Sequence, residues 1–235
     1  MIKAVFFDWF NTLARYEPAR EETASRVLKE LGYDIPPDKV RFAISLADRA
    51  WFEENTRSPV RARNAEEQQR VYARYQQTVL KEVGVDTANN PELLRKVLAR
   101  QQALSAAMHF VLFDDVLPAV NDLKERQMVL GVLTNLDQDM APLSRGLGLD
   151  KYVDFFVTSG EIGVDKPKAP IFQAAMKRAK VSAAEAIHVG DQYSVDVLGA
   201  RGVGMEGLLL DRFDYATDIT DCPRLHSLSE LVNYL

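Results

Sequence analysis

The amino-acid sequence predicts an α/β fold, with a doubly wound, mostly parallel sheet and an inserted all-helical domain. The apolar, β-favouring residues 1–7 end at Asp8, as expected for a buried strand that carries an acid at its tip. Residues 17–109 show helix signals and no strand signal, whereas strands and helices alternate from residue 114 to the end. We therefore assign residues 1–15 and 112–235 to an α/β core and residues 16–111 to the helical domain.

The helical domain has clear helix starts. Proline presets the backbone for a first helical turn, and an asparagine side chain accepts bonds from the first backbone N–H groups. Such residues predict four helices, which start near Pro18, Pro37, Asn64 and Asn90-Pro91. Glu67 follows Asn64 by three residues, which completes a capping-box pattern.

The α/β core has a regular alternation. Strands are expected at 128–134, 155–158, 186–189 and 207–210, and helices near 117–127, 137–147, 169–180, 193–203 and 227–235. The first strand must join this sheet, because a lone strand leaves its backbone groups unpaired. Side chains at the carboxyl ends of parallel strands meet in the crevice where open sheets bind ligands.

The composition limits the function classes. The chain has 235 residues, of which 47% are hydrophobic and 27% charged, as in ordinary globular proteins. A net charge of -5 argues against nucleic-acid binding, and no apolar run approaches the roughly 18 residues of a membrane span. Cys222 is the single cysteine, and the N-terminus enters a strand without a signal-peptide pattern. We expect a cytoplasmic protein that acts on a small molecule; its oligomeric state stays open.

Polar residues mark the expected strand tips: Asp8, Thr134, Lys166, Asp191 and Asp196. A carboxylate such as Asp8 can act as a nucleophile, a hydroxyl can donate to an anionic oxygen, and a lysine can neutralise developing negative charge. Each residue alone also has an ordinary structural explanation, such as a turn, a strand end, a solvated surface or a helix cap. The buried strand pattern around His188 assigns that histidine to the core.

The motifs occur together and in one order, and they resemble the four motifs of the haloacid dehalogenase (HAD) superfamily. These are Asp8-x-x-x-Thr12-Leu13, Leu133-Thr134-Asn135, Gly163-x-x-Lys166-Pro167 and Val189-Gly190-Asp191-x-x-x-x-Asp196. The helical insert is similar to the C1-type cap of that superfamily. We hypothesise that it moves as a lid, with hinges at residues 14–17 and 110–115. The resemblance implies catalysis by Asp8 and Lys166, and substrate binding by Thr134, Asn135 and Lys166.

A magnesium site also follows from the resemblance. It implies Mg²⁺ ligation by Asp8, the backbone carbonyl of Phe10 and Asp191, with Thr12, Gly190 and Asp196 in supporting roles. Neighbouring carboxylates repel one another, and a hard cation that prefers oxygen ligands relieves that repulsion. Asp196 either binds the cation through water, orients Lys166 or caps the following helix.

Phe10 departs from the commonest HAD phosphatase pattern. Phosphatases of the superfamily usually have a second aspartate there, which protonates the leaving oxygen and later activates water. A phenylalanine can do neither. Family dehalogenases do carry an aromatic residue at this position, need no metal, and usually lack the acidic pair seen here at Asp191 and Asp196.

Three functions therefore compete. The first is an Mg²⁺-dependent phosphatase that acts on a small metabolite, such as a sugar or triose phosphate, through an aspartyl-phosphate on Asp8. The second is a 2-haloacid dehalogenase in which Asp8 attacks carbon without a metal. The third is a catalytically weak protein that binds a phosphometabolite. The acidic pair favours the phosphatase, because unneutralised acids oppose anion binding.

Overall fold

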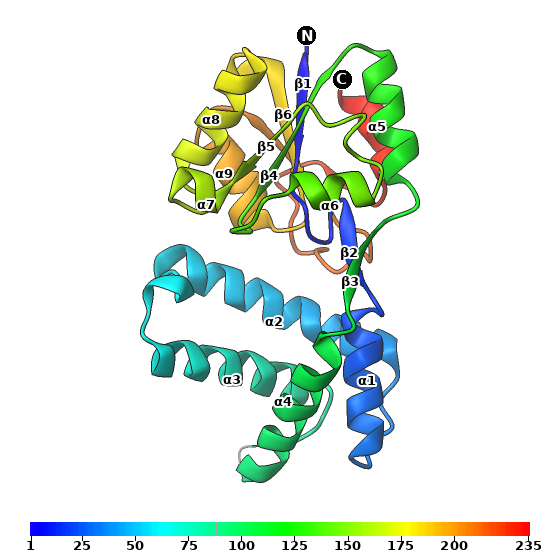
Figure 1. Ribbon diagram of the computed structural model, residues 1–235, viewed down its shortest axis with the longest axis vertical. Coiled ribbons are helices and arrows are strands. Elements are labelled where there is room, and N and C mark those ends of the chain that lie inside the picture. Colours follow the sequence, from blue (N-terminus) through cyan, green and yellow to red (C-terminus); the bar gives the residue numbers. More distant parts are fainter. Residues whose placement is uncertain (88) are drawn as a thin grey trace. The chain divides into compact units, whose positions relative to one another are not determined.

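The computed structural model describes residues 1–87 and 89–235. The chain divides into two compact units: unit 1 comprises Met1–Arg15 and Val111–Leu235, and unit 2 comprises Tyr16–Phe110. Figure 1 shows an α/β arrangement in unit 1 and helices in unit 2. The predicted fold class is confirmed. Each helix of the described chain falls short of the length or apolar character needed to cross a bilayer.

Unit 1 contains one sheet whose strands pair in parallel. Their order is β5 (Phe155–Thr158), β4 (Val129–Thr134), β1 (Ala4–Phe7), β6 (Ala186–Gly190), β7 (Glu206–Leu210) and β8 (Arg224–Leu225). The first strand lies between β4 and β6, with Phe7 opposite Val132 on one side and Val189 on the other. Three strand tips that are distant in sequence therefore lie side by side.

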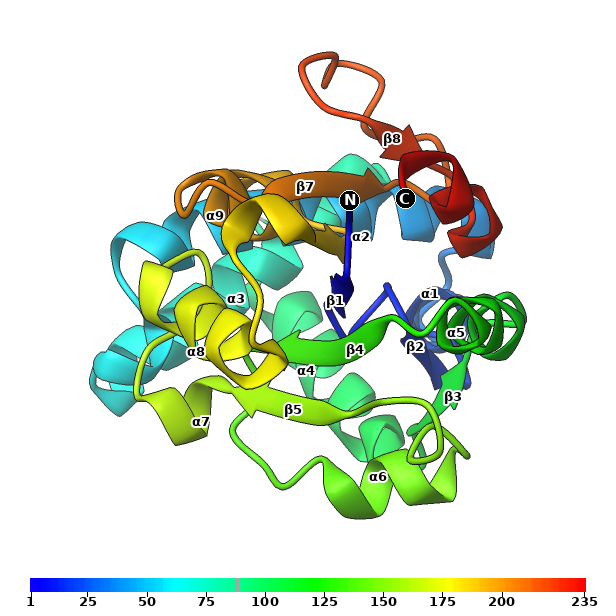
Figure 2. The same cartoon turned by 90° about the horizontal axis from the view of Figure 1, so that it is seen from above.

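Helices cover both faces of the sheet, as Figure 2 shows for α8 and α9 on one side and α5 on the other. The helices of unit 1 are α5 (Val116–Glu125), α6 (Ala141–Gly146), α7 (Ser159–Ile162), α8 (Ala169–Ala179) and α9 (Leu198–Arg201). Short helical turns add η2 (Ala183–Glu185), η3 (Tyr193–Val197) and η4 (Leu228–Tyr234). Phe6, Leu133 and Phe172 belong to the apolar core between β1, β4 and α8.

Three predicted helices of unit 1 differ from the structure. The helix predicted at 227–235 is the 3₁₀ helix η4, Leu228–Tyr234. The helix predicted at 137–147 begins only at Ala141, where the Asp139 carboxylate accepts a bond from the Ala141 N–H at 2.9 Å in the turn that precedes the helix. The helix predicted at 193–203 opens instead with the wide π-type turn η3. In that turn the Asp196 carboxylate folds back onto the Gln192 N–H at 3.0 Å.

Unit 2 contains the four predicted helices. They are α1 (Arg20–Glu30), α2 (Pro37–Arg57), α3 (Ala65–Glu82) and α4 (Pro91–Ser105), with a short 3₁₀ turn, η1 (Val60–Ala62). The capping box of α3 is present, since Asn64 accepts from the Glu67 N–H at 2.9 Å and Glu67 accepts from the Asn64 N–H at 3.3 Å. The sequence analysis missed two short paired strands, β2 (Ala14–Glu17) and β3 (His109–Leu112), near the proposed hinges.

The glycine in the middle of β4 provides a test of core packing. A Cβ at Gly131 would lie 2.5 Å from the Phe155 ring and 3.1 Å from the Phe6 ring, so these rings must shift. We expect Gly131→Ala to lower the free energy of unfolding by about 1–3 kcal/mol, measured by urea denaturation. At Gly146 an added Cβ would meet no described atom within 4 Å, so Gly146→Ala is the control. Equal stabilities of the two variants would contradict this account.

Candidate active site

Asp8 lies directly after β1, at the carboxyl edge of the sheet. Its N–H donates to the Val189 carbonyl at 2.8 Å, which fixes the residue beside the end of β6. The Asp8 loop (residues 8–14) then turns tightly, with the Leu13 N–H bonded to the Trp9 carbonyl at 3.0 Å and Asn11 in the left-handed region at φ 60°. The loop thus holds the Asp8 side chain at the sheet edge, where it is 13% exposed.

Lys166 joins two acids of the site. Its ammonium donates to Asp8 Oδ1 at 2.6 Å and to Asp196 Oδ1 at 2.7 Å. The Lys166 and Asp196 side chains are only 1% and 2% exposed, so water screens these contacts weakly. Buried charges require such partners, because the desolvation cost of an unpaired ion is several kcal/mol. The lysine therefore permits both carboxylates to remain ionised at the sheet edge.

The charges of the cluster shift the pKa values of its members. Burial raises the pKa of Asp8 to about 6, although Lys166 opposes the rise. Burial also disfavours ionised Asp196, but Lys166 and His188 outweigh it and hold the Asp196 pKa below its ordinary value. Burial likewise disfavours the ammonium, yet the two carboxylates raise the pKa of Lys166. The lysine is therefore charged at neutral pH, with Asp196 as its ionised partner.

Three acids are close enough to share a cation. Asp8, Asp191 and Asp196 each offer a carboxylate oxygen, and these atoms lie within 4.8 Å of one another. When all three are ionised, Lys166 compensates one charge, so two of the three negative charges remain among these four groups. A divalent cation would neutralise that excess, and an all-oxygen donor set suits Mg²⁺. The residues present therefore fit a hard divalent cation.

Asp191 and Phe10 are the other two predicted metal ligands. The Asp191 carboxylate accepts bonds from Gln192 Nε2 at 2.7 Å and from Asn11 Nδ2 at 3.4 Å, so it is oriented by neighbouring amides. Phe10 lies within the Asp8 loop and forms an isolated bridge with Ala14. Its carbonyl as a metal ligand stays a prediction.

The second predicted motif holds Lys166 in place. The Asn135 side chain accepts from the Lys166 N–H at 2.7 Å and donates to the Lys166 carbonyl at 3.2 Å. Both ends of the amide are thus bonded to the lysine backbone. Thr134, which is buried, accepts a bond from the Leu136 N–H at 3.2 Å. The substrate-binding roles of Thr134, Asn135 and Lys166 stay predictions.

The supporting residues occupy confined positions. A Cβ at Gly190 would lie 2.1 Å from Asp196 Cγ, so a glycine is needed where the carboxylate passes the strand end. Thr12 is fully buried in the Asp8 loop, and its hydroxyl has no hydrogen-bond partner among the described residues. Gly163, at the C-cap of α7, has φ 80°, a conformation that favours glycine.

His188 lies in the core, as the sequence predicts, but it also contacts the site. Its Nε2 lies 3.0 Å from Asp196 Oδ1, and its ring meets Phe172 edge-on at 5.3 Å. Burial lowers the His188 pKa, so the imidazole is neutral at physiological pH. The sequence analysis missed this contact, although His188 lies two residues before Gly190 on the same strand and therefore points to the same face.

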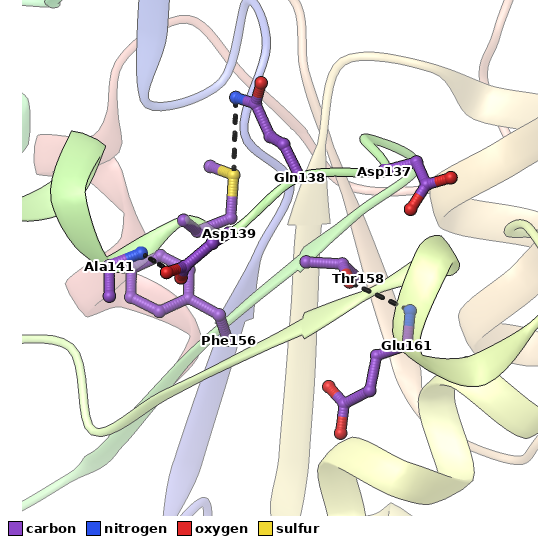
Figure 3. Close-up of a pocket in the computed structure, with 8 residues that line it drawn as sticks. Asp137, Gln138, Asp139, Ala141, Phe156, Thr158 and Glu161 are labelled. Carbon is purple, nitrogen blue, oxygen red and sulfur yellow. Dashed lines mark hydrogen bonds between the residues drawn. The ribbon is translucent and has the colours of Figure 1, made fainter.

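A pocket of about 400 Å³ lies next to the ends of β4 and β5 (Figure 3). It is lined by Asp137, Gln138, Asp139, Met140, Ala141, Phe156, Thr158 and Glu161. Neither Asp8 nor Lys166 lines it, and its three acidic side chains disfavour an anionic ligand. The pocket is therefore separate from the Asp8–Lys166 cluster.

Comparison with known proteins gives a family match over most of the chain. Residues 2–204 match the family model described as haloacid dehalogenase-like hydrolase. The "Haloacid dehalogenase-like hydrolase domain-containing protein 3" of Danio rerio is 40% identical over 101 residues, which cover 43% of this chain and 42% of that protein. The match thus spans less than half the length of that relative.

Two longer matches carry different activities in their names. The "Ribulose-1,5-bisphosphate 5-phosphatase" of Halopiger xanaduensis is 31% identical over 217 residues, which cover 90% of this chain and 85% of that protein. A solved structure of "2-Haloacid Dehalogenase from Pseudomonas syringae pv. Tomato DC3000" is 26% identical, has a TM-score of 0.56, and aligns over 99% of this chain and 97% of its own.

The buried ion cluster predicts a strong coupling between Lys166 and Asp196. Lys166→Met leaves a buried carboxylate without its partner, so it should lower the free energy of unfolding by about 3–5 kcal/mol. The double variant Lys166→Met/Asp196→Asn should regain much of that loss. Urea denaturation in EDTA measures both, since EDTA prevents a cation from replacing the ammonium.

The exposed neighbour Lys168 is the matched control for this cycle. Lys168→Met should leave the stability within about 0.5 kcal/mol of the unmodified protein. Asp196→Asn alone completes the cycle. A double variant whose loss equals the sum of the two single losses would show that the two side chains are not coupled.

Proposed function

Because the chain belongs to the haloacid dehalogenase-like hydrolase family, we propose that this hydrolase is an Mg²⁺-dependent phosphatase of a small phosphorylated metabolite. The observation that carries the proposal is the acidic trio of Asp8, Asp191 and Asp196, with Lys166 among its members. An uncompensated carboxylate trio would repel any anionic substrate, whereas a bound divalent cation would make the same trio attract a phosphate.

The proposed reaction uses Asp8 as the nucleophile. A carboxylate oxygen of Asp8 forms a bond to phosphorus, and the bond from phosphorus to the leaving oxygen breaks, with its electron pair going to that oxygen. Water then attacks the phosphorus of the aspartyl-phosphate, which releases phosphate and regenerates the Asp8 carboxylate. Magnesium, when bound by Asp8, Asp191 and the Phe10 carbonyl, would supply Lewis-acid stabilisation of the phosphoryl oxygens.

Lys166 has two proposed tasks in this reaction. In the substrate-free site its ammonium contacts Asp8 at 2.6 Å, which keeps the nucleophile ionised and oriented. In the transition state the same charge would stabilise negative charge that develops on the phosphoryl group. Thr134 would donate its hydroxyl to the substrate. Asn135 would bind the substrate and also hold the Lys166 backbone. These roles belong to the proposal.

Phe10 removes the usual route for protonating the leaving group. Its side chain has no titratable atom, so the leaving oxygen would take its proton from water, from the substrate itself or from the cap. A positioned acid contributes about 10²–10⁴-fold to a rate, so slow turnover on poor leaving groups follows from Phe10.

The substrate class belongs to the same proposal. The relative named as a ribulose-bisphosphate phosphatase supports a sugar phosphate, and a triose phosphate is the smallest member of that class we consider. We also propose that residues 16–111 act as a cap that selects substrates.

We further propose that the enzyme works in the cytoplasm, which is compatible with its single cysteine, Cys222.

A metal-independent 2-haloacid dehalogenase is the second candidate. Phe10 favours it, because expulsion of a halide needs no proton, and a solved dehalogenase shares the fold at 26% identity. The acidic trio opposes it, since the negative charge beside Asp8 would repel a 2-haloacid carboxylate. A weak phosphometabolite-binding protein is the third candidate and differs from the first only in turnover.

Two assays on one sample separate these candidates. We expect phosphate release from p-nitrophenyl phosphate and small sugar phosphates, loss of that activity in EDTA and its return with Mg²⁺. Asp8→Asn should abolish the activity and leave the thermal unfolding transition in place. Metal-independent chloride release from 2-chloropropionate, without phosphatase activity, would establish the dehalogenase instead. Tight phosphometabolite binding without either activity would establish the binding protein.

Restoring an acid at position 10 tests the account of Phe10. Phe10→Asp should raise kcat on alkyl phosphates by about tenfold or more, because an alkoxide leaves poorly without a proton. The gain should be smaller on p-nitrophenyl phosphate, whose leaving group departs without protonation, because only water activation in the common hydrolysis step can contribute there. Thermal unfolding checks that the loop tolerates the new carboxylate. The same gain on both substrate types would contradict the proposed role of the missing acid.

A further inference from the structure

A second largely buried cation, Arg212, contacts the second half of the Asp8 loop. Arg212 follows β7, and its guanidinium lies 4.0 Å above the Phe113 ring. Its Nη2 donates to the Thr12 carbonyl at 2.8 Å, and its Nη1 donates to Asp115 Oδ2 at 2.8 Å. The Arg212 side chain is 10% exposed. One side chain therefore links three separate segments of unit 1.

Thr12 is part of the loop that carries the nucleophile. Its carbonyl accepts from Arg212, and the next carbonyl, that of Leu13, accepts from the Phe113 N–H at 3.1 Å. At the start of the loop the Asp8 N–H bonds to the Val189 carbonyl at 2.8 Å, and other backbone bonds join the loop's own residues, such as Ala14 to Trp9 at 2.9 Å. The Thr12 and Leu13 carbonyls thus attach the second half of the loop to the rest of unit 1.

Several hydrogen bonds hold the Asp115 carboxylate in place beside Arg212. The same carboxylate oxygen that faces Arg212 also accepts from Ser227 Oγ and from the Leu228 N–H, each at 2.8 Å. Burial disfavours ionised Asp115, yet the bonds from Arg212, Leu228 and Ser227 outweigh burial and lower its pKa. Asp115 is therefore an ionised anchor at the start of α5, tied to η4.

A guanidinium is the side-chain group that can make all three contacts of Arg212 at once, with the Thr12 carbonyl, the Asp115 carboxylate and the Phe113 ring. Its planar fork offers separate N–H groups, so one reaches a carbonyl while another reaches a carboxylate, and its flat face stacks on an aromatic ring. A lysine ammonium has one nitrogen on a flexible stem and cannot reproduce both contacts and the stacking. Loss of the guanidinium would leave the Thr12 carbonyl buried without this donor.

We propose that Arg212 is a positioning residue that sets the Asp8 loop, and with it the attack geometry of Asp8, by holding the Thr12 carbonyl against Asp115. This inference rests on the proposed role of Asp8 as a nucleophile. Arg212 contacts neither the acidic trio nor Lys166 through any bond found among the described residues. It acts through the loop backbone, four residues after Asp8.

The kinetic consequence is a change in kcat rather than in KM. A displacement of about 1 Å at a reacting group can cost about 10²-fold in rate, while the groups that bind the substrate are unchanged. Arg212→Met should therefore lower kcat on p-nitrophenyl phosphate with Mg²⁺ by about 10–100-fold, and KM should change by less than about threefold. Arg212→Lys should fall between this variant and the unmodified enzyme.

Arg201 offers a matched control. It forms an arginine–aspartate pair with Asp221 at 3.0 Å in the same unit, and its side-chain bonds go to Asp221 and not to the Asp8 loop. Arg201→Met should leave kcat and KM unchanged. All rates are measured at temperatures well below the thermal unfolding of each variant, so that a loss of folded protein does not enter kcat.

Hydrogen exchange gives a readout that needs no activity. Backbone amides of residues 9–14 should exchange faster in Arg212→Met and Asp115→Asn than in the unmodified protein, while amides of β1 and β4 keep their protection. If the unmodified enzyme releases no phosphate, the proposed function fails, and exchange alone decides whether Arg212 sets the loop.

Two results would overturn the inference. One is unchanged kcat in folded Arg212→Met, with unchanged exchange over residues 9–14. The other is a rise in KM at constant kcat, which would make Arg212 a determinant of substrate affinity instead. Exchange that rises evenly over all of unit 1 would likewise assign Arg212 to general stability.

Discussion

The buried ammonium of Lys166 is the interaction on which the site depends. It lies 2.6 Å from Asp8 and 2.7 Å from Asp196, and these contacts allow carboxylates to be ionised where water is largely excluded. Several neighbouring features serve this one contact. Asn135 clamps the lysine backbone, Gly190 leaves room for the Asp196 carboxylate, and His188 bonds the same carboxylate from the core.

The sheet makes this contact possible between residues that are 158 positions apart. The first strand occupies the middle of the parallel sheet, so the loops after β4 and β6 flank the loop after β1. The carboxyl edge of such a sheet collects polar groups that the interior cannot hold. Arg212 extends the same principle to the end of β7, where a second buried cation holds the far half of the Asp8 loop.

Much of the fold could be predicted because its signals are local. Periodicity and helix caps predict the four helices of unit 2, and the apolar runs predict the buried strands around β1. The turn η3 could not be predicted, because it depends on Asp196 folding back onto the Gln192 N–H. The late start of α6 similarly depends on a side chain, Asp139, that competes for a backbone donor.

For the site, residue types and spacing predict which side chains gather, whereas contacts in space decide what each one touches. The family resemblance implies that Asn135 binds substrate, which stays a prediction, whereas only the folded chain shows that its amide is bonded at both ends to Lys166. No local pattern marks Arg212, since its partners Thr12 and Asp115 lie 200 and 97 residues away. Long-range polar contacts of this kind require the folded chain.

The charge of the site, and not the shape of the fold, distinguishes the candidate functions. The fold is compatible with attack on carbon or on phosphorus. In the proposed function, an acidic trio with one lysine would require a divalent cation before an anion could bind. A crystal structure with Mg²⁺ and beryllofluoride, which mimics a phosphoryl group on a carboxylate, tests this claim most directly. The account predicts beryllium bonded to an Asp8 oxygen and the cation in contact with Asp8 and Asp191. A cation bound elsewhere, or beryllofluoride absent from Asp8, would contradict it.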